Sequence, residues 1–126
     1  MSAERSLSVQ PAVAADVPGV IHLIGRVFAE YGFVFDPPTE LPDLFAFDRH
    51  YAEPHGAFFV VRDGGAVVGS VGVERLDGGR AELHRLYLDA GLRGRGLGRT
   101  LADAVVDWCR AQGIDHLVHW LSLIHI

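Results

Sequence analysis

Residues 86–99 join an apolar segment to a helix through a glycine-rich loop, and this stretch most restricts what the chain can fold into. The loop holds four glycines within eight positions: Gly91, Gly94, Gly96 and Gly98. Because glycine has no Cβ, the backbone can come close to a ligand, and the first N–H groups of a helix have no partner inside it. The helix dipole favours negative charge at the same end. Three arginines add permanently charged donors: Arg93, Arg95 and Arg99. The stretch therefore predicts an anion site between a strand and a helix.

Two common phosphate-binding loops are excluded by the spacing of these glycines. The dinucleotide fingerprint G-x-G-x-x-G would start at Gly94 and needs a glycine at position 99, which is Arg99. A P-loop would start at Gly91 and needs a lysine after Gly96, where the chain has Leu97. The chain contains no lysine at all. The anion site must therefore belong to another class.

The pattern that remains is R-x-x-G-x-G, formed by Arg93, Gly96 and Gly98, and it follows the strand-like residues 82–88. In this position, after a strand and before a helix, it resembles the acetyl-CoA loop of the GNAT superfamily of N-acetyltransferases. The alternative is a glycine-rich turn with surface arginines and no ligand. The resemblance implies that acetyl-CoA is the cosubstrate and that it is bound by these residues: Leu86, Tyr87, Leu88, Arg93, Gly94, Arg95, Gly96, Leu97, Gly98 and Arg99.

The resemblance also implies an α/β fold with a mixed sheet, in which an antiparallel meander is followed by a parallel strand-helix-strand crossover. Apolar alternation and glycine turns predict four strands before the loop: 7–9, 57–62, 66–73 and 80–88. Helical spacing of apolar residues predicts three helices: 17–31, 41–51 and 97–111. A last strand, at 114–120, would run parallel to the strand at 80–88 because a helix crosses between them. We expect one N-acetyltransferase domain over residues 1–126.

The first predicted helix has two positions of interest. Asp16 precedes Pro18, so we expect Asp16 to be the N-cap and Pro18 to lie in the first turn. Gly25 lies in the helix interior, where glycine costs about 1 kcal/mol relative to alanine. We therefore expect another group to approach Gly25 closely.

The strand before the loop contains an irregular step. From Leu83 to Leu86 the apolar positions break strict alternation, which predicts a β-bulge near His84 and Arg85. A bulge there would turn backbone groups of residues 86–88 outward, free to pair with the amide arm of a pantetheine. The resemblance implies the same contacts.

Acetyl transfer to an amine needs a neutral amine, donors for the thioester carbonyl and a proton for the leaving thiolate. Glu82 is the first candidate base, as the resemblance implies for a strand glutamate, and the alternative is a surface carboxylate paired with Arg80 or His84. Histidine side chains in general can accept a proton near neutral pH, so His84 is the second candidate, or else a polar surface residue. Tyr87 is either an acid or a packing residue. Cys109 lies among apolar helix residues, so we expect it to pack rather than react.

Phe33 and Phe35 lie in an apolar, proline-rich segment between the first two predicted helices. The resemblance implies that this segment lines the acceptor side of the site, and the alternative is that both rings fill the core. Charge is divided unevenly, since residues 1–74 hold four arginines and ten acids, whereas residues 75–126 hold seven arginines and six acids. This division suits an anionic nucleotide on the second half and a cationic amine approaching the first.

Composition argues against several other classes. No broad basic face outside the loop supports a nucleic-acid partner, and no apolar run approaches the ~20 residues that cross a membrane. Residues 1–5 lack an apolar signal segment and Cys109 is the only cysteine, so we expect a reducing, cytoplasmic location. His116 and His119 would face opposite sides of a strand, so we expect no metal site.

The pattern of the resembled family stops after residue 120. Residues 121–126 contain no turn residue and no aromatic acid, so we expect the chain to lack the usual C-terminal helix and hairpin. The strand at 114–120 would then have an uncovered edge, which favours self-association as a homodimer, and the alternative is that residues 121–126 fold back and cover this edge. Two hypotheses remain. One is an acetyl-CoA-dependent N-acetyltransferase for a small-molecule or peptide amine, and the other is a CoA-binding or sensor module without turnover.

Overall fold

The structure, a computed structural model, describes residues 7–119 and the backbone of residues 122–125. Its strands are β1 Val9–Pro11, β2 Gly56–Asp63, β3 Ala66–Arg75, β4 Arg80–Leu88, β5 His116–His119 and β6 Ser122–His125. Its helices are α1 Val17–Glu30, α2 Pro37–Glu40, α3 Phe47–Tyr51 and α4 Leu97–Ala111. The strands form one sheet in chain order, in which β4 and β5 are parallel and the other neighbours antiparallel. The predicted α/β fold with a mixed sheet is therefore confirmed.

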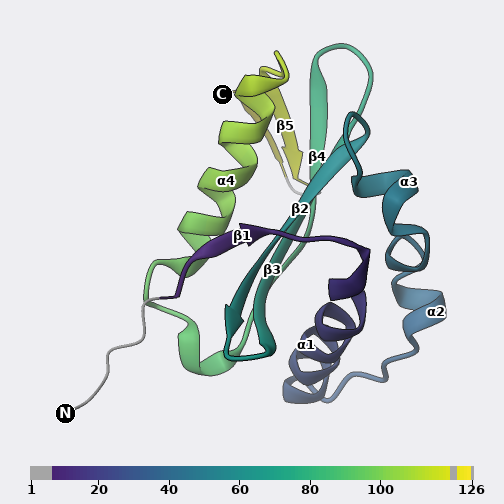
Figure 1. The fold of residues 1–126 in the computed structure, drawn as a ribbon, viewed down its shortest axis with the longest axis vertical. Coiled ribbons are helices and arrows are strands. Elements are labelled where there is room, and N and C mark those ends of the chain that lie inside the picture. The colour runs from purple at the N-terminus through teal and green to yellow at the C-terminus, as the bar shows by residue number, and fades with distance from the viewer. Residues whose placement is uncertain (1–6, 120–121, 126) are drawn as a thin grey trace.

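Helices cover both faces of the sheet. The first three helices lie on one face and α4 lies on the other (Figure 1). The core beneath α1 and α3 consists of Val20, Leu23, Ile24, Val27, Leu41, Leu44, Phe47, Tyr51, Phe58, Val60 and Val67. The core beneath α4 consists of Val61, Val68, Val71, Val73, Ala81, Leu101, Val105, Cys109, Ile114 and Leu117. Cys109 is fully buried here, as expected for a packing residue. In the described part of the chain, no helix combines the length and apolar character needed to cross a membrane.

The antiparallel meander turns at glycines, as the sequence predicts. Gly64 has φ +64° in the β2–β3 turn, and Gly78 and Gly79 have φ +71° and +73° before β4. Glycine adopts this left-handed region without the steric cost of a Cβ. The short edge strand was predicted two residues early, since β1 begins at Val9 and its pairing with β2 extends to Pro11.

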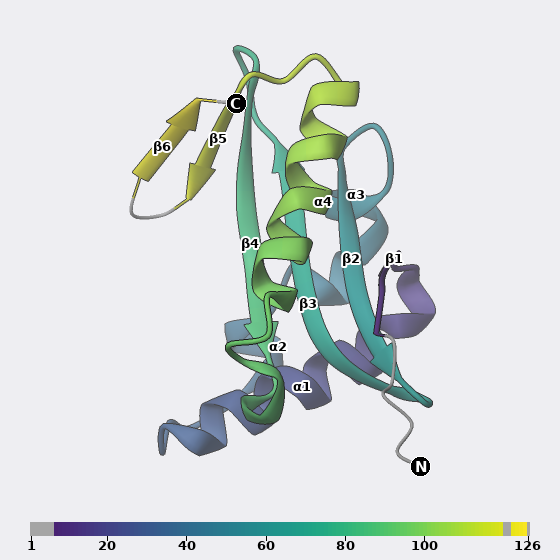
Figure 2. The same ribbon diagram turned by 90° about the vertical axis from the view of Figure 1, so that its left-hand side faces the viewer.

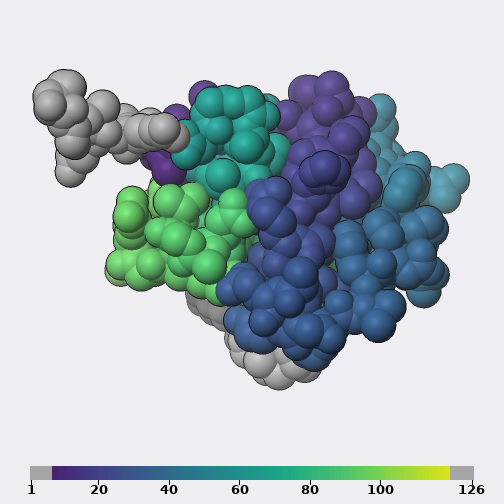
Figure 3. Space-filling model, turned by 90° about the horizontal axis from the view of Figure 1, so that it is seen from below, coloured from purple at the N-terminus to yellow at the C-terminus, as the bar shows by residue number. Residues whose placement is uncertain are grey.

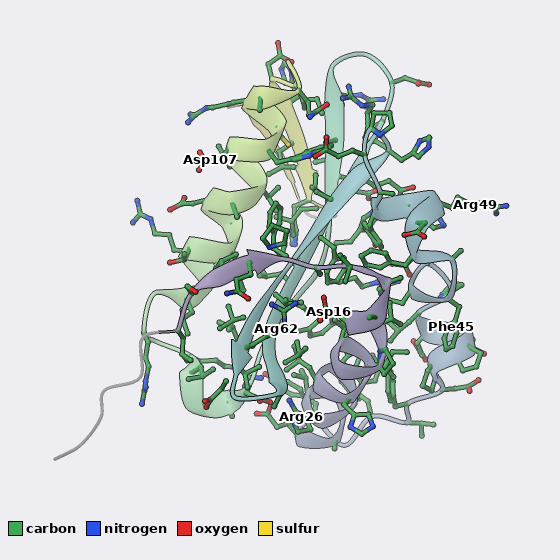
Figure 4. The ribbon with its side chains drawn as sticks, in the orientation of Figure 1. Asp16, Arg26, Phe45, Arg49, Arg62 and Asp107 are labelled. Carbon is green, nitrogen blue, oxygen red and sulfur yellow. The ribbon has the colours of Figure 1, made fainter. Side chains whose placement is uncertain are left out.

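The helix α1 begins where the sequence predicts, with Pro18 in its first turn, but Asp16 does not cap it through its side chain. The Asp16 carboxylate instead accepts a hydrogen bond of 2.9 Å from the Val13 N–H and pairs with Arg62 at 2.8 Å. Figure 4 shows Asp16 and Arg62 directed toward each other. Asp16 therefore fastens the start of α1 to β2 rather than stabilising its free N–H groups.

The predicted helix at 41–51 is wrong in its extent. The structure has the short α2, a 3-10 helix at Leu44–Ala46 and then α3. Pro42 explains the break, because a proline disfavours the helical conformation of the residue before it. Leu41 accordingly has φ −130° and ψ +49°. Phe45 from the 3-10 helix points outward and is 58 % exposed (Figure 4).

The last strands differ from the expectation of an uncovered edge. β5 pairs with β4 on one side, and all four of its residues pair with β6 on the other (Figure 2). The uncovered edge predicted for β5 is therefore wrong, because residues close in sequence supply an antiparallel neighbour. The predicted end of that strand at residue 120 and the expectation for residues 1–5 lie outside the described residues.

Two glycines permit close approach between elements. A Cβ at Gly25 would lie 3.1 Å from the Phe35 ring, which confirms the expected close neighbour of α1. A Cβ at Gly72 on β3 would lie 2.8 Å from the Tyr51 ring and 2.9 Å from the Phe58 ring. Gly72 therefore lets α3 lie directly on the sheet.

We expect Gly72→Ala to lower the free energy of unfolding by about 1–3 kcal/mol, because the methyl group overpacks two buried rings. The control is Gly65→Ala, since a Cβ at Gly65 meets nothing within 4 Å and its φ is not positive. Denaturant unfolding of both variants makes the comparison. Equal free energies of unfolding for Gly72→Ala and Gly65→Ala would contradict the close packing of Tyr51 and Phe58 on Gly72.

Candidate active site

The candidate site lies where β4 separates from β5. The two strands pair only over Arg80–Glu82 of β4, and β4 then continues for six residues without β5 beside it (Figure 2). A hollow of about 270 Å³ opens there, lined by Glu82, Leu83, His84, Arg85, Leu86, Tyr87 and His119. This edge of β4 is therefore open to an extended ligand.

The predicted bulge is confirmed. Gly72 pairs with His84 and Ser70 pairs with Tyr87, so Arg85 and Leu86 together oppose a single residue of β3. Arg85 has φ +57°, a left-handed conformation that is uncommon for residues other than glycine. The Ser70 hydroxyl donates a hydrogen bond of 2.8 Å to the Arg85 carbonyl. The fully buried Ser70 thus holds the bulge from β3.

Asp43 holds the side chain of the same bulge residue. Its carboxylate accepts hydrogen bonds from the Arg85 guanidinium, one of them 3.1 Å long, and from the Tyr51 hydroxyl. Burial raises the pKa of the Asp43 carboxyl, but the hydrogen bonds from Arg85 and Tyr51 and the Arg85 charge outweigh it and lower that pKa. Burial and the adjacent Asp43 raise the pKa of Tyr51 far above its ordinary value. The sequence analysis missed this group, since nothing local links Asp43 to a residue 42 positions away.

The glycine loop enters α4 in the geometry expected of an anion site. Gly94 and Gly96 both have φ +81°, and Gly96 is the N-cap of α4. The first backbone hydrogen bond of the helix runs from the Thr100 N–H to the Gly96 carbonyl at 3.1 Å. The N–H groups of residues 97–99 precede that bond and have no partner inside the helix. A Cβ at Gly98 would lie 3.5 Å from the Leu88 side chain, so this turn packs directly on β4.

The three loop arginines play different parts. Arg93 forms a two-pronged pair with Glu30 of α1, at 2.7 and 2.8 Å, and also donates to the Leu88 carbonyl at 2.8 Å. Hydrogen bonding to Glu30 raises the pKa of the Arg93 guanidinium. Arg95 and Arg99 are exposed and form no ion pair within the described residues. Figure 3 shows the loop lying against α1 on this side of the molecule. Arg93 therefore braces the loop, and Arg95 and Arg99 remain for an anion.

Glu82 and His84 lie together in the hollow. The Glu82 Oε1 atom is 3.5 Å from His84 Nε2, so the pairing of these two residues that the sequence analysis kept open is present. His84 Nε2 is also 3.4 Å from Glu74 Oε1, and Glu74 Oε2 is 2.8 Å from His50 Nδ1. Glu74 and His50 were not identified from the sequence. Glu74 lies just beyond the strand predicted at 66–73, and no local spacing indicates its neighbours.

Tyr87 and Cys109 both pack against core residues. Tyr87 is partly buried against the core beneath α1. Burial raises the pKa of the Cys109 thiol to about 11, so the thiolate is scarce at neutral pH. Cys109 is therefore unsuited to act as a nucleophile.

The two candidate acceptor aromatics occupy different environments. The Phe35 ring lies 4.9 Å from the Phe28 ring and is partly buried against the core, in agreement with the core-filling alternative. Phe33 is 64 % exposed and Val34 is 87 % exposed. Phe33 also stacks with the exposed Tyr31, with 5.9 Å between ring centroids. Only Phe33 of this pair is thus available to a ligand.

The histidines of β5 do not gather metal ligands around them. His116 Nδ1 lies 2.7 Å from Asp115 Oδ1, and His119 lines the hollow. Within residues 7–119, no three histidine, cysteine or acidic side chains converge in a way that could hold a metal ion.

We expect Asp43→Asn to lower the free energy of unfolding at neutral pH by about 2–3 kcal/mol, because it leaves a half-buried guanidinium without its counter-charge. The folded-state pKa of Asp43 lies below its ordinary 3.8, so the carboxylate stabilises the protein above about pH 4. This stabilisation is lost as the pH falls through the folded-state value. The gap between wild type and variant should therefore close in acid. Urea unfolding between pH 2 and 7 measures this difference in the free energy of unfolding, and Asp107→Asn, at an exposed position, is the control. A difference that does not depend on pH would contradict the stabilising role of the Asp43 carboxylate.

Comparisons with known proteins find similarity over most of the chain. A profile of the acetyltransferase (GNAT) family matches residues 23–124. The uncharacterized N-acetyltransferase YjgM of Escherichia coli (strain K12) is 33 % identical over 103 residues, which span 78 % of this chain and 62 % of that protein. The chain thus spans less than two thirds of the length of that relative.

Solved structures share the fold. A GNAT-family acetyltransferase from Staphylococcus aureus Mu50 matches with a TM-score of 0.82 at 24 % identity, over 90 % of this chain and 72 % of that one. A predicted acetyltransferase from Clostridium acetobutylicum, solved with acetyl-CoA, matches with a TM-score of 0.75 at 14 % identity, over 90 % of this chain and 80 % of that one.

Proposed function

The chain belongs to the acetyltransferase (GNAT) family, and on this premise we propose that it transfers an acetyl group from acetyl-CoA to a primary amine by direct attack in a ternary complex. One observation carries the proposal. The open edge of β4 and the glycine loop meet at Leu88, so a ligand with an extended arm and a pyrophosphate can use both at once.

We propose that the pyrophosphate binds at the start of α4. The free N–H groups of Leu97, Gly98 and Arg99 and the helix dipole would meet it there. Arg95 and Arg99 would add charge-assisted hydrogen bonds. Upstream, the pantetheine arm would pair with backbone groups of residues 86–88 along the open edge. Arg93 would act indirectly, by holding the loop against Glu30.

We propose that the acetyl group and the amine meet in the hollow beside Glu82 and His84. Backbone N–H groups along β4 would stabilise the thioester oxygen, because they are fixed donors in a partly enclosed space. Glu82, directly or through a water, would take a proton from the amine, and His84 is the second candidate for this role. The amine nitrogen then attacks the carbonyl carbon, the C–S bond breaks and the thiolate takes a proton. No covalent nucleophile is needed.

On the acceptor side, the exposed Phe33 and the acidic first half of the chain favour a small-molecule or peptide amine that carries positive charge. Phe35 would support this wall from the core rather than contact the acceptor. A cytoplasmic location and a homodimer remain further parts of the proposal. The second candidate function, a CoA-binding or sensor module, differs only in the absence of turnover.

We expect Gly96→Val to lower CoA affinity at least tenfold, which is about 1.4 kcal/mol, because the side chain enters the space of the pyrophosphate. Gly64→Val is the matched control, since both glycines have positive φ and open space around them. Both variants should lose about 1–2 kcal/mol of stability through backbone strain. Calorimetry with CoA decides. If the folded Gly96→Val protein bound CoA as tightly as the wild type, the pyrophosphate would not bind at this loop.

We expect the wild-type chain to release thiol from acetyl-CoA with at least one amine in a mixed panel, and Glu82→Gln to lower kcat about a hundredfold. The KM for acetyl-CoA should change little, because backbone groups hold the cosubstrate. Asp107→Asn, on the exposed side of α4, is the control. CoA binding without thiol release from any amine would favour the sensor module instead.

A further inference from the structure

A line of imidazole and carboxylate groups, each within 3.5 Å of the next, leads away from the hollow. Glu82 and His84 line it, whereas Glu74 lies behind them on β3 and His50 lies at the end of α3. The successive distances are 3.5 Å from Glu82 to His84, 3.4 Å from His84 to Glu74 and 2.8 Å from Glu74 to His50. The four side chains are between 27 % and 34 % exposed, so each is partly shielded from water.

Glu74 is the link in this line. Its two carboxylate oxygens face different imidazoles. Oε1 lies 3.4 Å from His84 Nε2, and Oε2 is hydrogen-bonded to His50 Nδ1 at 2.8 Å. Glu74 is also the direct cross-strand partner of Glu82. Two carboxylates at such paired positions repel each other unless a proton or a cation lies between them.

His84 Nε2 occupies the place where such a proton would be shared. It lies within 3.5 Å of both carboxylates, yet among the described residues it is buried without a well-formed hydrogen bond. A small movement of the imidazole would complete a bond to either carboxylate. The arrangement can therefore pass a proton between Glu82 and Glu74.

We propose that His84, Glu74 and His50 form a relay that carries the proton of the acceptor amine from the hollow to the surface beside α3. This inference rests on the proposed acetyl transfer. An amine that enters as an ammonium ion loses one proton before it attacks, and the second N–H proton balances the thiolate that leaves. One proton per turnover must therefore reach the solvent. Glu82 or His84 takes that proton from the amine. Glu74 and His50 act through His84 as positioning residues: they accept the proton from it, so that the group that took the proton is ready for the next turnover.

Two neighbouring groups in the described part of the chain, Tyr51 and Arg85, are engaged with Asp43 instead. The Tyr51 ring is 6.0 Å from His50 and 6.5 Å from His84, but its hydroxyl donates to Asp43. Arg85 is paired with the same carboxylate. His119, on β5, also lines the hollow. Among the described residues, the line through Glu74 therefore joins Glu82 to α3.

The kinetic test uses the full chain, acetyl-CoA and the best amine of the panel, with His50→Gln and Glu74→Gln. Below the pKa of the amine, we expect each variant to lower kcat about tenfold, with KM for acetyl-CoA unchanged and the rate raised by added imidazole buffer. Above that pKa the amine enters neutral, so the deficit should disappear. His22→Gln, on the exposed side of α1, is the control. A deficit that is equal at all pH values, or absent, would overturn the relay.

A second measurement needs no turnover. Nuclear magnetic resonance of the histidine ring nitrogens should show that Glu74→Gln changes the titration curves of both His50 and His84 and leaves His22 unchanged. Unchanged curves for either His50 or His84 would overturn the relay even in an active enzyme. A wild-type chain that turns over no amine would instead contradict the proposed function, and the titration curves would still decide whether the groups are connected.

Discussion

The left-handed bulge at Arg85 is the constraint on which the rest of the site depends. A non-glycine residue keeps φ +57° only when its surroundings fix it. Ser70 holds the Arg85 carbonyl from β3, and Asp43 holds the guanidinium from the segment before α3. Since the carbonyl and the side chain of Arg85 are both fastened, β4 beyond the bulge keeps its course away from β5. The open edge is therefore a built feature of the sheet.

The two ends of β4 are joined to different elements, which divides the chemistry. At Leu88 the strand meets the glycine loop, and the loop is fastened to α1 through Arg93 and Glu30. At Glu82 the strand meets a carboxylate and imidazole line that ends on α3. The anion side thus consists of backbone N–H groups and arginines, and the proton-accepting side consists of carboxylates and histidines. This separation would keep the pyrophosphate of the proposed cosubstrate away from Glu82, so the two groups of like charge would not compete.

Local features of the sequence were the ones predicted correctly. Turn glycines, strand alternation, the broken step after Leu83 and the start of α4 each depend on residues within a few positions of one another. The break in the predicted helix at 41–51 was also encoded locally, in Pro42, but the apolar spacing outweighed it in the prediction. The side chain of Asp16 was misassigned because a distant cation, Arg62, competes with the helix N–H groups for it.

The sequence alone thus determined the order of the main elements from β1 to β5, the bulge and the glycine loop at the start of α4, because backbone conformation follows from near neighbours. Only the tertiary structure decided which side chains meet. Asp43 with Arg85, Glu30 with Arg93, and Glu74 with His84 come from separate elements, and their meeting depends on how α1 and α3 pack on the sheet. The identity of the groups beside Glu82 is therefore a property of packing, since no spacing along the chain encodes a contact between a helix and a strand that it covers.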